Sequence, residues 1–283
     1  MVLLFEYLLY GCLLLQQKML SLPSYKNTMI ENLLTPYISG RFVSDTRYRE
    51  GHLRVINALP QRKVLGLHTP EMKKVAQELW RKDGEGYIKA FEAAVHALLT
   101  YEETVIWGFL INKGKYTLDE RLAMLARYVP VLDNWAVCDS YCANAKWLAK
   151  ADKERLWAFL QRWFASHREF EVRFAVVVSM CHFLTEEWIA KVFQRLDAIE
   201  FDKISSEYVT QKGKPTVAQN GTVQGAGPYY VRMAVAWLLA TALAKLPDAT
   251  RSYARAAQLP PDVIKMYVRK ARESFRTHTV PAL

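Results

Sequence analysis

The chain has 283 residues, of which 51% are hydrophobic and 23% are charged, a composition typical of a soluble globular protein. This length allows one large domain or two small ones with a sizeable core. Lys and Arg number 38 against 28 Asp and Glu, a formal net charge of +10, which favours a polyanionic partner such as nucleic acid or an acidic membrane surface.

The cysteines and histidines give no metal-binding spacing. No Cys-x-x-Cys pair occurs, which argues against a zinc ribbon, and no His-Glu-x-x-His motif is present. Cys138 and Cys142 lie one helical turn apart, and we interpret them as two small buried side chains rather than as metal ligands. The sequence therefore predicts neither a metal site nor a cofactor.

Residues 1–28 are apolar but are interrupted by Glu6, and the run is too short for a clear membrane span. No basic segment precedes the apolar run, as it would in a signal peptide. We expect an apolar N-terminal extension or an extra helix packed on the body, with a membrane anchor as the less favoured alternative. Met29 begins a stretch typical of a first helix, and we expect one domain over 29–283.

The rest of the chain predicts one helix after another. A threonine N-cap followed by proline opens a helix over 69–82, and two capping boxes pair Thr100 with Glu103 and Thr117 with Glu120. Apolar residues recur with a period of 3.6 in the other predicted helices, at 87–99, 101–112, 118–128, 134–149, 153–167, 170–183, 186–198, 229–246, 249–257 and 261–276. Short connectors favour antiparallel helix pairs, so the fold class is all-α, an α-solenoid of HEAT-like repeats with a concave face.

One segment, 203–228, lacks helix signals. Asn220 and Gly221 stand between two runs that favour strands, which is typical of a tight β-hairpin turn. We expect either a surface loop or a projecting β-hairpin near 205–227, made positive by Lys203, Lys212 and Lys214.

An aromatic residue and an acid share one helix face where 134–149 begins. Trp135 and Asp139 lie four residues apart, although a lone Trp is usually core and a lone Asp usually solvated. Arg173 lies in a strongly apolar helix, and Trp237 lies in the middle of another. The helix of Trp237 also carries Tyr229, Tyr230 and Arg232. An acid, an arginine and two tryptophans from three helices can line one cleft.

Five segments together resemble the DNA alkylation repair family of HEAT-like-repeat DNA glycosylases. They are YREGHLRVINALPQRKVLGLHTPEMKKVAQEL, VPVLDNWAVCDS, EFEVRFAVVV, YYVRMAVAWLLA and VRKARESFR, in that order over roughly Tyr48 to Arg276, interrupted by 203–228. The resemblance implies a C-shaped helical protein that holds duplex DNA in a basic concave face and excises cationic N3- or N7-alkylated purines. It places the family's active-site tryptophans at Trp135 and Trp237, its catalytic aspartate at Asp139 and its cleft arginine at Arg173.

Two alternatives remain open. DNWAVCDS and YREGHLRVINALP also resemble divergent family members that keep the scaffold without excision, and 203–228 resembles a projecting hairpin that other members use with branched DNA. The chain is then a noncatalytic DNA-binding repair accessory that recognises branched or distorted DNA. A HEAT-type protein-interaction scaffold with an incidental basic face is the third interpretation.

The expected interactions follow from these interpretations. We expect Tyr229 and Tyr230 to join Trp135 and Trp237 at the lesion or its sugar. Basic side chains that can contact phosphates are Lys146, Lys150, Arg168, Arg173, Arg232, Lys265, Arg269, Lys270, Arg272 and Arg276. Partners are double-stranded or branched DNA, with no metal and no membrane, and we expect a monomer in the cytoplasm associated with the bacterial nucleoid.

Overall fold

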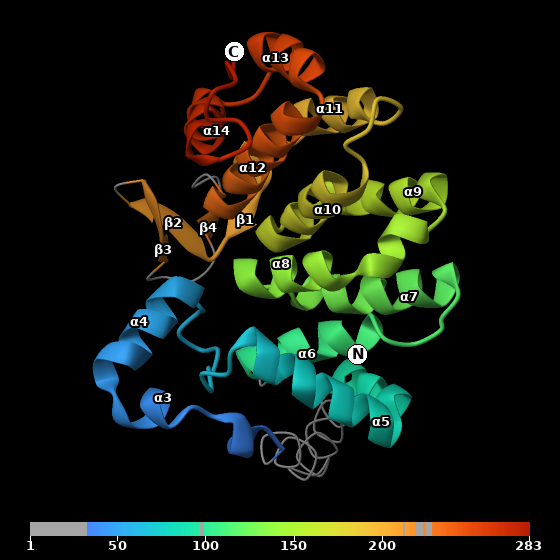
Figure 1. Cartoon of the computed structure of the whole chain (residues 1–283), viewed down its shortest axis with the longest axis vertical. Coiled ribbons are helices and arrows are strands. Elements are labelled where there is room, and N and C mark those ends of the chain that lie inside the picture. The colour runs from blue at the N-terminus through green and yellow to red at the C-terminus, as the bar shows by residue number, and fades with distance from the viewer. Residues whose placement is uncertain (1–32, 95, 97–98, 212, 219–222, 225–227) are drawn as a thin grey trace, which may run out of the picture.

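The computed structural model describes residues 33–94, 96, 99–211, 213–218, 223–224 and 228–283 (Figure 1). The described residues are mostly helical, as predicted, with a small amount of β-structure. The α-helices are α3 (Gly40–Ser44), α4 (Thr46–Ile56), α5 (Thr69–Ala93), α6 (Tyr101–Ile111), α7 (Leu118–Tyr128), α8 (Trp135–Asn144), α9 (Lys153–Phe164), α10 (Glu169–His182), α11 (Ile189–Asp197), α12 (Tyr229–Lys245), α13 (Pro247–Ala256) and α14 (Pro261–Glu273). Short 3₁₀ helices cover Thr35–Tyr37, Val129–Val131, Lys146–Lys150 and Phe201–Lys203. The predicted extension over 1–28 lies outside the described residues.

Two helices predicted at 69–82 and 87–99 are one element, α5, that ends at Ala93. A kink at Asp83, with φ −168° and ψ 72°, divides it. The Asp83 carboxylate accepts a hydrogen bond from the backbone N–H of Gly86 at 3.0 Å and so acts as an N-cap for the part of α5 that follows the kink. Both predicted capping boxes, at the starts of α6 and α7, are confirmed.

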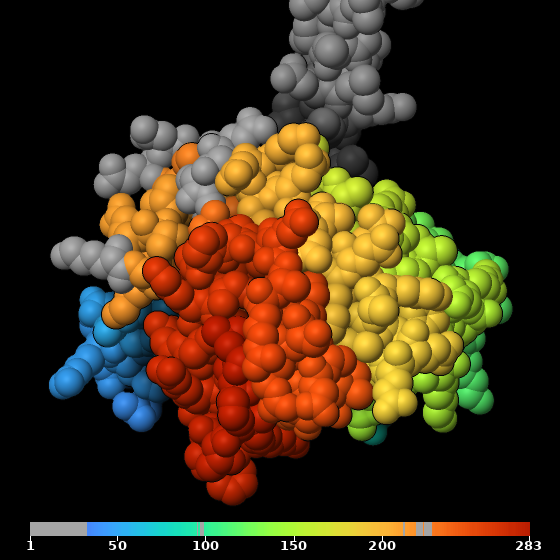
Figure 2. Space-filling view, turned by 90° about the horizontal axis from the view of Figure 1, so that it is seen from above, coloured from blue at the N-terminus to red at the C-terminus, as the bar shows by residue number. Residues whose placement is uncertain are grey.

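A row of packed helices forms the core. In order, α5 packs on α6, α6 on α8, α8 on α10, α10 on α12 and α12 on α14 (Figure 1). Every residue of α6 is buried, and α10 is buried from Glu169 to Met180, because these two helices have neighbours on both sides. From above, the C-terminal helices (red) lie between α3–α4 (blue) and the α10–α11 region (yellow) (Figure 2).

The segment predicted as a loop or hairpin contains four short strands, β1 (Ser205–Ser206), β2 (Tyr208–Gln211), β3 (Lys214–Val217) and β4 (Val223–Gln224). β2 pairs antiparallel with β3 in the register Tyr208↔Val217, and β1 pairs antiparallel with β4. The predicted pairing of the runs around Asn220 and Gly221, two residues outside the described part, is therefore wrong. Gly213, with φ 73°, supplies the β2–β3 turn, and the fully buried Tyr208 fixes the register from the core.

Hydrogen bonds attach the N-terminal helices to the start of α8. Arg62 donates to Asp133, to the carbonyl of His96 and to the carbonyl of Leu99 at 2.5–2.8 Å. Asn134, the N-cap of α8, donates to the carbonyl of Ile56 at 2.9 Å. These contacts fix the direction in which α8 enters the row of helices. Among the described residues, no helix is both long enough and apolar enough to cross a membrane.

The loop before α5 packs closely against Phe42 of α3, and one substitution tests this packing. Gly66 has φ +87°, and a Cβ there would lie 2.2 Å from the Phe42 ring, so Gly66→Ala should destabilise the protein by about 1–3 kcal/mol. Gly51→Ala is the matched control, because Gly51 lies inside α4 with open space around it and alanine should add about 0.5–1 kcal/mol there. Urea denaturation measures both changes, and shifts of the same sign would contradict this description.

Candidate functional site

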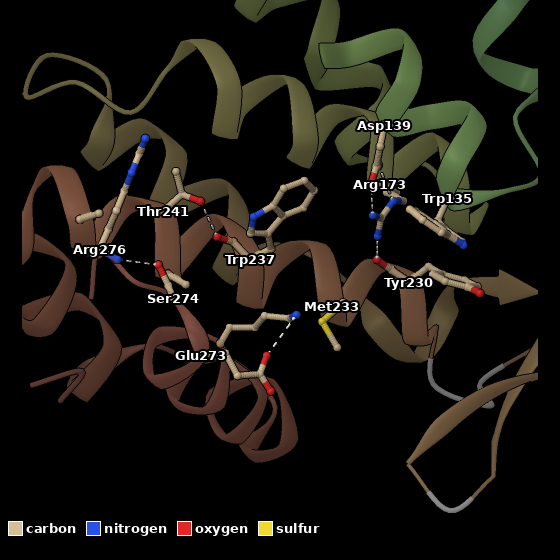
Figure 3. Close-up of a pocket in the computed structure, with 13 residues that line it drawn as sticks. Trp135, Asp139, Arg173, Tyr230, Met233, Trp237, Thr241, Glu273, Ser274 and Arg276 are labelled. Atoms are coloured by element: carbon tan, nitrogen blue, oxygen red, sulfur yellow. Dashed lines mark hydrogen bonds and ion pairs between the residues drawn. The ribbon is translucent and has the colours of Figure 1, made fainter. Parts of the chain in front are cut away.

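A cavity of about 650 Å³ opens between α8, α10, α12, α14 and the residues that follow α14 (Figure 3). It brings together side chains from positions up to 141 residues apart in the sequence. The lining residues are Trp135, Asp139, Arg173, Tyr230, Met233, Trp237, Ala240, Thr241, Ala244, Lys270, Glu273, Ser274 and Arg276. The acid, the arginine and both tryptophans that the sequence placed on three helices thus face one cavity.

A two-pronged ion pair lies in the cavity wall. Arg173 donates from Nε to Oδ1 of Asp139 at 3.0 Å and from Nη2 to Oδ2 at 2.7 Å. Its remaining nitrogen, Nη1, donates to the carbonyl of Tyr230 at 2.6 Å. The Arg173 side chain is 4% exposed and that of Asp139 is 17% exposed, so the carboxylate is the member of the pair that faces the cavity. Two parallel N–H···O bonds fix the plane of the carboxylate as well as its position.

The electrostatics keep the guanidinium of Arg173 charged. Burial alone lowers the pKa of Arg173, but the charge and hydrogen bonds of Asp139 outweigh it, so the net pKa is raised. A buried guanidinium without its carboxylate would be strongly unfavourable. The two residues therefore depend on each other, and Arg173 fixes the position of the Asp139 carboxylate at the cavity wall.

Three of the four expected aromatic residues line the cavity. Trp237 is 39% exposed, and its indole lies beside the ion pair in Figure 3. Trp135 is partly buried on the other side of the pair in that view. Tyr230 is buried, and its hydroxyl accepts a hydrogen bond from Asn57 at 2.9 Å. Tyr229 lies outside the cavity lining and packs edge-on against Tyr230.

The expected phosphate-binding residues divide into three groups. Lys270 and Arg276 line the cavity, and Lys270 lies 3.4 Å from Glu273. Arg173 also lines it, but all its hydrogen bonds go to Asp139 and Tyr230, as described above. The others lie away from the cavity lining: Lys146, Lys150, Arg168, Arg232, Lys265, Arg269 and Arg272.

Sequence reasoning missed several residues of the site. Met233, Thr241, Glu273 and Ser274 line the cavity, and only Glu273 had a signal, its spacing from Arg269 and Lys270 on a basic helix. Glu169 was also missed. Its carboxylate is buried between α10, β1 and the start of α12, where it accepts from the backbone N–H of Tyr230 at 2.7 Å and from the hydroxyl of Ser206.

The described residues contain no cluster of three or more His, Cys, Asp or Glu that could hold a metal ion. Cys138 and Cys142 are both buried, and burial raises the pKa of the Cys142 thiol well above its usual range. A thiol of this kind stays protonated and does not supply the thiolate that metals prefer.

Comparison with known proteins identifies the family. The sequence model of the DNA alkylation repair enzyme family matches residues 42–214, and the chain belongs to that family. Membership indicates a role in DNA repair with DNA as the partner. The match includes Asp139 and Arg173 but ends within β3, before the α12 and α14 walls of the cavity. No match was found among curated proteins or among solved structures.

The buried carboxyl group of Glu169 gives a pH-dependent prediction. Burial raises its pKa to about 7 from 4.5, so the unfolded chain releases this proton at a lower pH than the folded protein does. Stability should therefore fall as pH rises from about 4.5 to about 7, by about 3 kcal/mol in total. Glu169→Gln has no such proton, so its stability relative to the wild type should rise over this window. Urea denaturation at pH 5 and pH 8 measures the difference, and equal differences at both would refute the assignment.

Proposed function

We propose that the protein is a DNA glycosylase that excises cationic N3- and N7-alkylated purines from duplex DNA by hydrolysing the N-glycosidic bond. The observation that carries the proposal is the Asp139 carboxylate, held in one orientation by Arg173 at the wall of a cavity that Trp135 and Trp237 also line. Membership of the DNA alkylation repair enzyme family supports it.

The chemistry suits a single fixed carboxylate. An N3- or N7-alkylated purine already carries positive charge and leaves as a neutral base, so no acid is needed to protonate it. Positive charge then develops on the sugar, and Asp139 stabilises it electrostatically and orients the attacking water. A preorganised contact of this kind contributes about 3–4 kcal/mol to transition-state stability.

The two tryptophans also interact with the positive charge of the alkylated nucleotide. A cationic nucleotide over the face of an indole gains about 0.5–2 kcal/mol from cation–π attraction. Trp237 offers such a face because it is exposed to the cavity, and Trp135 borders the carboxylate. Arg173 acts here by orienting Asp139 rather than by contacting a phosphate, because each of its three nitrogens already donates to Asp139 or Tyr230 and its side chain is only 4% exposed.

The row of helices supplies the surface for DNA. We propose that it is a HEAT-like α-solenoid, C-shaped, forming one DNA-binding domain over 29–283 of a monomer in the cytoplasm. Lys270 and Arg276 border the cavity and contact phosphates beside the lesion, and the other predicted basic residues, apart from Arg173, contact the DNA backbone on either side.

Binding to branched or distorted DNA without excision is the second candidate function. The strand segment favours it, because β2 and β3 form a hairpin whose Lys214 is exposed. Excision and binding to four-way DNA are measured separately, so the two functions are distinguishable.

Replacing the carboxylate tests the enzyme directly. Asp139→Asn should lower the excision rate of 7-methylguanine and 3-methyladenine from alkylated duplex by about 10²–10³-fold, because the amide has no charge to stabilise the sugar cation. Asp119→Asn is the control, since Asp119 on α7 also pairs with an arginine, Arg155, but lies outside the cavity lining. The control should retain the wild-type excision rate. Equal base release by wild type and Asp139→Asn excludes the proposed enzyme.

The salt dependence of binding tests the phosphate contacts. The double substitution Lys270→Gln with Arg276→Gln should reduce the slope of log affinity against log salt by about 1.8, if each contacts one phosphate. The control removes the same charge elsewhere, at Arg155 and Lys191, whose partners are Asp119 and Glu154. A slope that changes equally in both variants would show that only net charge matters.

A further inference from the structure

The helix that carries Trp237 has an incomplete N-terminus. The N-cap of α12 is Pro228, which has no side chain able to accept a hydrogen bond from the first turn. The free N–H groups at a helix start need such an acceptor. The acceptor comes instead from the neighbouring helix α10, where the Glu169 carboxylate accepts a hydrogen bond from the backbone N–H of Tyr230 at 2.7 Å.

The same carboxylate holds the inserted strands. Its second oxygen accepts from the hydroxyl of Ser206 in β1, and that hydroxyl oxygen in turn accepts from the backbone N–H of Tyr208 at 2.9 Å. Tyr208 is fully buried, meets the ring of Tyr230 edge-on at 5.0 Å and donates to the carbonyl of Asn57 at 2.8 Å. The beginning of the inserted segment is thus part of the core behind the cavity.

The first turn of α12, which Glu169 caps, also makes a hydrogen bond to the Arg173–Asp139 ion pair. The carbonyl of Tyr230 accepts from Nη1 of Arg173, whose other two donors grip Asp139. A shift of this turn therefore moves the Tyr230 carbonyl, which is the acceptor that holds Nη1 of Arg173. Hydrogen bonds thus lead from Ser206 to Glu169 and on to the backbone N–H of Tyr230, and from the carbonyl of Tyr230 to Arg173 and Asp139.

We propose that Glu169 is a positioning residue for Asp139, and that the inserted strands brace it through Ser206. Its consequence for excision rests on the proposed glycosylase function. The capping itself does not depend on that function.

Ionisation of Glu169 matters to this role. The ionised carboxylate accepts both hydrogen bonds more strongly than a neutral group does and attracts Arg173. The titratable or charged groups that face it are Arg173 on α10, Tyr208 on β2 and Tyr230 on α12. Burial raises the pKa of Glu169 to about 7, so the ionised form is lost as pH falls through neutrality. The excision rate should fall with it.

Two substitutions separate capping from charge. Glu169→Gln keeps an acceptor for the N–H of Tyr230 but cannot ionise, so its kcat should match that of the wild type at pH 5.5 and fall about fivefold below it at pH 8. KM should change little. Glu169→Ala removes the cap and should lower kcat at every pH. The matched control is Glu171→Gln, whose carboxylate accepts from Ser166 and Arg168 rather than from α12.

Hydrogen exchange tests the cap without any need for excision. The amides of Tyr230 and Val231 should exchange about fivefold faster in Glu169→Ala than in the wild type, the effect of losing one helix cap. Ser206→Ala, a milder change, should show a smaller increase in the same two amides. Unchanged exchange in both variants overturns the capping role, and unchanged kcat profiles in an active enzyme overturn the coupling to Asp139. A wild type that excises nothing overturns the glycosylase alone, because the exchange result still decides the capping.

Discussion

The bidentate pair between Arg173 and Asp139 is the interaction on which the site depends. A buried arginine requires a compensating negative charge, and breaking such a pair by removing one partner costs about 3–5 kcal/mol. The pair joins α8 to α10, and the third hydrogen bond of Arg173 joins α10 to α12. The electrostatic need to neutralise one guanidinium therefore fixes three helices and leaves one carboxylate facing a cavity.

That carboxylate has the opposite sign to the protein around it. A net charge of +10 attracts the DNA backbone over long range, whereas the Asp139 carboxylate acts only on a cation that comes close to it. The two signs have different roles in the proposed function, since the basic side chains bind phosphates and the Asp139 carboxylate acts on the positively charged lesion. Exposed aromatic faces support the second step without adding charge.

Much of the fold was accessible from the sequence because helix periodicity and capping are local signals. Trp135 and Asp139 could be placed on one face from their spacing alone, and the capping boxes at α6 and α7 formed as expected. Helices α3 and α4 were not predicted. The predicted strand pairing was wrong because β3 pairs with β2, whose Tyr208 is buried in the core, and the sequence carries no local signal for that tertiary contact. The capping of α12 by Glu169 joins residues 61 positions apart, and no local pattern signals such a contact.

The central claim is that the cavity recognises positive charge at the sugar through Asp139, and a binding measurement tests it most directly. Two duplexes are compared, one with a cationic pyrrolidine in place of a nucleotide and one with the neutral tetrahydrofuran of the same shape. The wild type should bind the cationic duplex about tenfold or more tightly, and Asp139→Asn should bind both alike. Equal affinity of the wild type for the two duplexes would contradict the account.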